Sequence, residues 1–150
     1  MEDPEFAIEP GIASSAQVAN ARAWWAFAHE IGIPRRFWSA SFREARPSRA
    51  VEAARVYVEQ GAFECDESLV LAGPTGVGKT YAAVSILRAL SRTDTLPRHR
   101  RFVYFPGACA ALLDPDRRAE MLARLTGTSL LVLDDFGVEY VKEGGLLDAL

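Results

Sequence analysis

The hydrophobic and polar positions predict a helical first half of the chain. Over residues 15–30, SAQVANARAWWAFAHE is rich in alanine and places apolar residues at helical spacing, so we expect a helix there. A second helix is expected for RAVEAARVYVEQ, with Ser48 as its N-terminal cap and Gly61 at its end. Residues 31–47 between them have no regular pattern and carry several aromatic side chains.

After residue 67, short apolar runs alternate with helical patterns. Strands separated by helices indicate βαβ units, so we expect an α/β fold with a parallel, doubly wound sheet flanked by helices and an α-helical N-terminal extension. The expected strands are SLVLAG (68–73), RFVYF (101–105) and SLLVLDD (129–135), and the expected helices are KTYAAVSILRALSR (79–92), 114–125 and a last one beginning at GGLLDAL.

Composition and charge exclude several classes of protein. With 49% hydrophobic and 25% charged residues, the 150-residue chain has the balance of one globular domain, not of a disordered protein. Cys65 and Cys109 are the two cysteines and stand far apart, which argues against a zinc site or a disulfide framework. The acidic first residues are unlike a signal peptide, and no apolar run approaches the roughly 20 residues of a membrane span. We therefore expect a cytoplasmic protein without membrane contact.

One segment between the first expected strand and its helix carries a phosphate-binding pattern. Residues 73–80 fit GxxxxGK[ST] in full; they are Gly73, Pro74, Thr75, Gly76, Val77, Gly78, Lys79 and Thr80. The glycines allow backbone N–H groups to wrap a polyphosphate, and the helix that follows directs its positive end toward it. We expect Lys79 to reach the β- and γ-phosphates as a catalytic residue, and the Thr80 hydroxyl to ligate Mg²⁺. The alternative is a glycine turn that only resembles this loop.

The third expected strand ends in two carboxylates. Leu130-Leu131-Val132-Leu133 is followed by Asp134 and Asp135, which fits the acidic strand of a P-loop nucleoside triphosphatase, the Walker B element. In such enzymes the first acid holds Mg²⁺, usually through water, and the second orients or deprotonates the attacking water. We expect these roles for Asp134 and Asp135. An ordinary strand ending at solvent is the alternative, and Asp135 is shorter than the glutamate more common at its position.

The motifs together resemble the DnaC/IstB-type ATPases, a branch of the AAA+ superfamily. Three stretches carry the resemblance: Ile33-Pro34-Arg35-Arg36-Phe37 with Ala40-Ser41-Phe42, similar to the family's IPxRF…ASF segment; the phosphate loop at 73–80; and Leu130 to Gly137, similar to its LLxxDDxG strand. The resemblance covers residues 31–150 and divides the chain into an acidic leader with a helix (1–30) and a partial ATPase domain (31–150).

The resemblance implies a helicase loader that uses Mg²⁺ and ATP to deliver a replicative DNA helicase onto single-stranded DNA, and a homo-oligomer in the full-length form. IstB-type relatives serve transposition instead. By the same analogy, Ile33, Pro34 and Phe42 are candidates to contact the base; sealing of the core is the equal alternative. Two other functions remain open: a nucleotide-dependent interaction module without hydrolysis, and a small-molecule phosphotransferase, which the long N-terminal section disfavours.

The chain also departs from the family pattern. AAA+ sheets run in the order 5-1-4-3-2, so a fourth strand lies between the first and the third. The sequence stops at Leu150, before such a strand and before sensor residues, an arginine finger or a lid. The three strands present would leave unpaired backbone groups in the sheet. We therefore expect a fragment or truncated reading frame that is not a competent ATPase alone.

Two surface features have both a functional and a plain interpretation. Arginines form two groups, at positions 88, 92, 98, 100 and 101 and at positions 35, 36, 43, 46 and 49. They could contact the phosphates of single-stranded DNA, although a solvated surface is the simpler interpretation. Trp24, Trp25 and Phe27 share one expected helix and suggest either a partner surface or packing onto the core.

Overall fold

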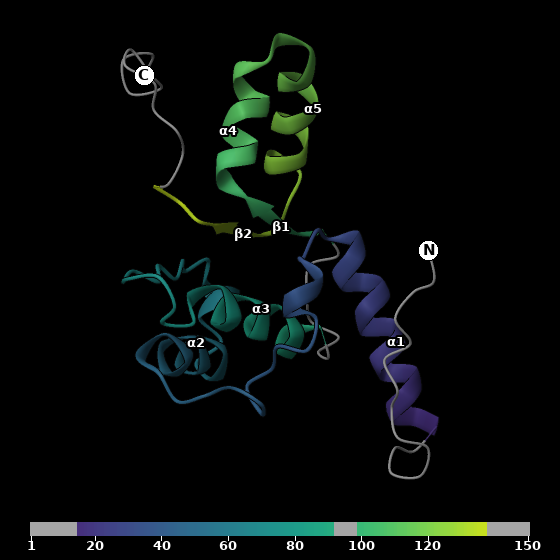
Figure 1. Cartoon of the computed structure of the whole chain (residues 1–150), viewed down its shortest axis with the longest axis vertical. Coiled ribbons are helices and arrows are strands. Elements are labelled where there is room, and N and C mark those ends of the chain that lie inside the picture. The colour runs from purple at the N-terminus through teal and green to yellow at the C-terminus, as the bar shows by residue number, and fades with distance from the viewer. Residues whose placement is uncertain (1–14, 92–98, 138–150) are drawn as a thin grey trace.

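The computed structural model describes residues 15–91 and 99–137, and Figure 1 shows how their helices and strands are arranged. In chain order, these elements are α1 (Ser15–Glu30), η1 (Arg35–Phe37), α2 (Arg49–Glu59), η2 (Ala62–Cys65), α3 (Lys79–Leu90), β1 (Arg100–Tyr104), α4 (Phe105–Leu113), α5 (Pro115–Thr126) and β2 (Leu130–Asp134). The predicted acidic leader and the last predicted helix lie outside the described residues. None of the helices in this part of the chain has both the length and the apolar character needed to cross a bilayer.

Strands β1 and β2 form a parallel pair in which Arg100 lies opposite Leu130 and Tyr104 opposite Asp134. Parallel strands require a crossover connection, which α4 and α5 provide here. In Figure 1 the α4–α5 pair lies on one side of the two strands, and α2 and α3 lie on the other. This arrangement confirms the mixed α/β class and the parallel pairing of the second and third predicted strands.

The first predicted strand is wrong as a strand assignment. Residues 67–72 belong to no helix or strand, and the Val70 side chain is 85% exposed. Leu69 and Leu71 nevertheless pack against a cluster of buried residues of α2 and α3. A strand exists only where a second backbone completes its hydrogen bonds, and within the described residues the sheet contains β1 and β2 alone.

Helix α3 is the centre of the packing. The first core cluster joins it to α1, β1 and the segment after α1; its buried members are Trp24, Ala28, Ile31, Ile33, Ala40, Val84, Leu87 and Phe102. The second joins α3 to α2; its buried members are Val51, Ala54, Ala82, Ile86 and Leu90. Because α3 starts at the residues of the predicted phosphate loop, packing on two sides of this helix fixes where that loop lies.

The aromatic residues of α1 take part in this packing. Trp24 is 6% exposed, and its indole Nε1 donates a hydrogen bond to the Trp38 carbonyl at 2.6 Å. Trp25 and Phe27 are half-buried and pack against the first cluster. The structure therefore supports the packing interpretation of these three side chains.

Helix α4 has no counterpart among the predicted elements. The second strand was predicted to run to Phe105, whereas it ends at Tyr104 and Phe105 is the first residue of α4. A proline is tolerated in the first turn of a helix, where its missing N–H would have no partner. Ala108, Cys109 and Ala111 are buried, so packing stabilises a helix whose Pro-Gly start resembles a turn in the sequence.

Candidate functional site

The predicted phosphate loop connects the extended residues 67–72 to α3. Its glycines have backbone angles that other residues rarely adopt: φ is +145° at Gly73, +87° at Gly76 and +88° at Gly78. Gly78 is also the N-terminal cap of α3, so the positive end of this helix lies at the loop. A Cβ atom on Gly76 would have no described heavy atom within 4 Å, so this side of the loop is open.

Lys79, the first residue of α3, folds back over the start of the loop. Its Nζ donates hydrogen bonds to the carbonyls of Gly73 and Pro74, both at 2.8 Å. An ammonium group has three N–H donors, so these two bonds leave it able to donate to an anion as well. The Lys79 ammonium group is thus held beside the loop backbone, where a bound phosphate would also lie.

The loop meets the acidic strand through one hydrogen bond. Thr80 Oγ1 donates to Asp134 Oδ1 at 2.9 Å, although the two residues are 54 positions apart in the sequence. Thr80 follows Lys79 in the first turn of α3, and Asp134 is the last residue of β2. The structure therefore brings together the two residues predicted to hold the metal.

The environment of Asp134 raises the pKa of its carboxyl. Burial is the largest cause, because it disfavours the charged form, and the negative charge of Asp135 acts in the same direction. Hydrogen bonds from Thr80 and from the Asp135 backbone, together with the charge of Arg36, oppose this shift. Burial thus makes the ionised form of this carboxyl less favourable than in an ordinary aspartate, which is the direction that a bound cation would reverse.

The oxygen atoms of Thr80 and Asp134 suit Mg²⁺. This ion prefers oxygen ligands, keeps several waters and is commonly bound through one or two carboxylates plus phosphates. Among the described residues, no cluster of three or more His, Cys, Asp or Glu side chains has metal-binding geometry. A cation at this position would accordingly depend on phosphate and water oxygens as well as on the protein.

Asp135 was predicted to be the last residue of the third strand, but it lies just beyond that strand. β2 ends at Asp134, and Asp135 is exposed with a positive φ of 57°, a conformation that aspartate tolerates better than most residues. Its backbone N–H donates a hydrogen bond to the Asp134 carboxyl. The next residue, Phe136, stacks on Phe105 with the ring centroids 4.5 Å apart.

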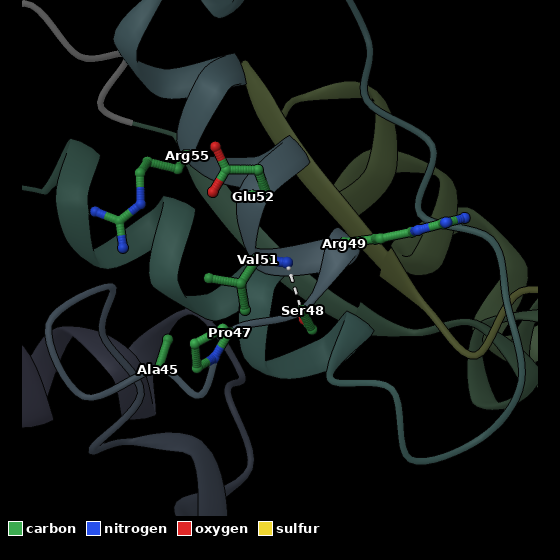
Figure 2. A pocket seen from close by; sticks show the side chains of 7 residues that line it. All are labelled: Ala45, Pro47, Ser48, Arg49, Val51, Glu52 and Arg55. Atoms are coloured by element: carbon green, nitrogen blue, oxygen red, sulfur yellow. Dashed lines mark hydrogen bonds between the residues drawn. The ribbon is translucent and has the colours of Figure 1, made fainter.

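A pocket of about 500 Å³ opens around the start of α2, and Figure 2 shows the residues that line it. One of them, Ser48, caps α2 by accepting a hydrogen bond from the Val51 N–H at 3.2 Å. The Ser48 hydroxyl lies 3.7 Å from where a Cβ atom on Gly78 would be, so the pocket adjoins the phosphate loop. Ser48 is the helix cap that its sequence pattern predicts, but nothing in that pattern indicates a pocket there.

The three candidates for contact with a base do not line this pocket. Ile33 is 4% exposed and belongs to the first core cluster, as the packing alternative required. Pro34 is exposed. Phe42 packs beside the second cluster, and the guanidinium of Arg55, which does line the pocket, lies 5.2 Å from its ring centroid.

The two groups of arginines differ in their surroundings. Arg88 donates to the carbonyls of Ser39 and Ala40, and Arg100 lies 4.8 Å over the Phe27 ring, so both stabilise packing. The second group is exposed at positions 35, 36, 43, 46 and 49. Positions 92 and 98 lie outside the described residues.

No family model, curated protein or solved structure matches the chain. The assignment of a function therefore depends on the residues at this site and on their geometry.

Proposed function

We propose that this protein binds a nucleoside triphosphate together with Mg²⁺ at residues 73–80 and Asp134. The observation that carries the proposal is the 2.9 Å hydrogen bond from Thr80 Oγ1 to Asp134 Oδ1. It joins the end of a glycine loop with positive φ angles to a half-buried carboxylate at the end of β2. A glycine turn that only resembled a phosphate loop would not require a hydrogen bond between the following threonine and a distant aspartate.

Each part of the site contributes a distinct interaction. The loop amides and the N-terminus of α3 bind phosphate oxygens, and Lys79 adds a full positive charge. Thr80 and Asp134 would hold Mg²⁺, which when bound neutralises charge on the β- and γ-phosphates. Asp135 is proposed to orient a water molecule for attack on the terminal phosphate. Its exposed position leaves room for that water.

The pocket beside the loop supports a nucleotide over inorganic polyphosphate. Its volume of about 500 Å³ lies within the usual range for small-molecule sites, roughly 300–1,000 Å³. Because the Ser48 hydroxyl lies beside Gly78, this pocket is a candidate place for a base and sugar attached to phosphates on the loop. ATP is the nucleotide that the family resemblance favours.

The same resemblance supports a more specific proposal, that the protein is an ATPase of the DnaC-like helicase-loader type that acts on a replicative helicase at single-stranded DNA. The stretches 33–42 and 130–137 carry it. An IstB-like role in transposition, or a module that binds nucleotide without hydrolysis, would use the same site. Measuring ATP hydrolysis separates a hydrolase from a passive module. A hydrolase should hydrolyse ATP as the wild-type protein and should lose this activity in Asp135→Asn while its ATP affinity is retained.

Calorimetric titration with ATP, with and without Mg²⁺, tests the binding proposal. We expect saturable binding that Mg²⁺ strengthens about tenfold, and we expect Thr80→Val to remove that strengthening. The matched control is Thr126→Val, because the Thr126 hydroxyl bonds within α5 to the Leu122 carbonyl, far from the loop. ATP binding that is undetectable, or that is equal with and without Mg²⁺, would contradict the proposal.

A further inference from the structure

The pocket at the start of α2 combines an apolar part with a row of polar side chains. The apolar part is formed by Ala45, Pro47 and Val51. The row consists of Ser48, Glu52 and Arg55, and spacings of four and three residues place these side chains on one face of α2. Figure 2 shows them in this order along the helix. In small-molecule sites, a few polar groups of this kind fix the orientation of the ligand.

The row begins beside the phosphate loop and continues along α2. The Ser48 hydroxyl lies 3.7 Å from the position of a Cβ atom on Gly78. An α-helix rises about 1.5 Å per residue, so Glu52 lies about 6 Å and Arg55 about 10 Å farther along the helix axis. In a nucleotide the sugar follows the phosphates directly, and the base is more distant. A nucleotide that extends from the loop along this row therefore has its sugar beside Glu52.

Glu52 brings an unpaired carboxylate to this pocket. It is exposed, and within residues 15–91 and 99–137 no hydrogen bond or ion pair engages its carboxylate. Its neighbour Arg55 is instead held against Phe42, because Arg55 Nη2 donates to the Phe42 carbonyl at 3.1 Å and the guanidinium lies 5.2 Å from the ring centroid. The negative charge of Glu52 is therefore not neutralised by an ion pair within the described part of the chain.

A carboxylate at this place selects for particular ligand groups. Ionised carboxylates accept hydrogen bonds but cannot donate them, and ionised phosphates carry the same sign of charge, so the two repel each other. Glu52 therefore suits a ligand that has O–H or N–H donors next to its phosphates. The ribose hydroxyls are such donors, and acidic side chains bind them in dinucleotide-binding folds.

We infer that Glu52 is a specificity-determining residue that accepts hydrogen bonds from the ribose hydroxyls of a bound nucleotide. The site then prefers ribonucleoside triphosphates to 2′-deoxyribonucleoside triphosphates. This inference rests on the proposed function and adds the sugar to the parts of the ligand that the protein recognises. Glu52 also lies in the first turn of α2, where an acid stabilises the positive end of the helix, but that structural role requires no preference among sugars.

The test compares the affinities for Mg²⁺-ATP and Mg²⁺-dATP of the wild-type protein with those of Glu52→Gln, Glu52→Ala and Glu59→Gln. The wild-type protein should bind dATP about tenfold more weakly, because dATP lacks the 2′-hydroxyl and its charge-assisted hydrogen bond. This ratio should fall to about threefold in Glu52→Gln, whose neutral oxygen is a weaker acceptor, and to about one in Glu52→Ala. Glu59→Gln should keep the tenfold ratio, because Glu59 is exposed on the same helix but does not line the pocket.

The ratio of the two affinities separates recognition of the sugar from a structural role, because a loss of helix stability weakens the binding of both nucleotides equally. Equal binding of ATP and dATP by the wild-type protein, or a ratio that is unchanged in Glu52→Ala, would overturn the inference while the proposed function stands.

Inosine triphosphate, which lacks the amino group of adenine, provides a further comparison. If Glu52→Ala changed the ratio of ATP to inosine triphosphate affinity but not that of ATP to dATP, Glu52 would contact the base and the inference would fail. A wild-type protein that binds no nucleotide would overturn both the inference and the proposed function.

Discussion

Residues 67–72 and strand β2 are two apolar segments that both lead to the candidate site, yet only one is a strand. Their sequences are similar: SLVLA precedes the phosphate loop, and SLLVLDD contains β2. In β2 the residues pair with β1 in a regular parallel register. In the first segment Val70 is 85% exposed, and Leu69 and Leu71 pack against the second core cluster. Similar propensity therefore produces different structures, because a strand depends on a neighbour.

The difference shows that the two halves of the site are built in different ways. The loop half depends on local features, namely glycines with positive φ and a helix that begins at Lys79. The carboxylate half depends on tertiary structure, because Asp134 reaches Thr80 only when β2 pairs with β1 and packs against the first core cluster. Variants in the two halves should accordingly differ in what they affect.

The largest effect is expected on the loop side. Lys79→Ala removes the only full positive charge of the loop and two hydrogen bonds that shape it, so ATP affinity should fall roughly 100-fold or more. Calorimetry or a fluorescent ATP analogue measures this loss. Arg117→Ala, at an exposed position on α5, is the charge control. Retained affinity in Lys79→Ala would mean that the loop does not bind the phosphates.

On the strand side, Asp134→Asn should act through the metal. Asparagine keeps an oxygen that can accept the Thr80 hydrogen bond but loses the charge, so the Mg²⁺-dependent part of ATP affinity should fall about tenfold. Without Mg²⁺ the affinity should stay the same or rise. A loss that is equal with and without Mg²⁺ would assign Asp134 to the fold and not to the metal.

Lowering the pH should weaken the Mg²⁺-dependent part of ATP affinity in the wild-type protein, as Asp134→Asn does. The folded-state pKa of Asp134 is raised, mainly by burial, so protonation begins at a higher pH than for an ordinary aspartate. Strengthening of ATP binding by Mg²⁺ should disappear as the pH falls through this raised pKa. The folded protein gains stability over the same range, because it binds the proton more readily than the unfolded chain. In Asp134→Asn the part of each dependence that Asp134 contributes should be absent.

The smallest effect concerns stability and addresses the two segments directly. Val132→Ala in β2 removes contacts with the first core cluster and should lower the free energy of unfolding by about 1 kcal/mol. Val70→Ala, at an exposed position, should change it by less than about 0.5 kcal/mol. Chemical denaturation measures both. A cost at Val70 equal to that at Val132 would show that residues 67–72 are buried in solution.

Local patterns were enough to predict several elements. The bounds of α1 match the prediction, and Ser48 caps α2 as expected, because alanine-rich helical spacing and a cap act within one turn of the chain. The loop at 73–80 was found from its pattern alone. Helix α4 was missed because Pro106 and Gly107 usually indicate a turn, and only its packed side chains, such as Ala108 and Cys109, show why a helix forms there.

The amino-acid sequence by itself determined which residues are suited to hold phosphate and metal, since glycine freedom, a lysine and paired carboxylates are properties of residue types. Only the tertiary structure decided which residues meet: Thr80 with Asp134, and Ser48 beside Gly78. It also decided that β2 is a strand and that residues 67–72 are not. The physical reason is that hydrogen-bonded pairing and burial join residues far apart in the chain, whereas a sequence pattern records only the preferences of neighbours.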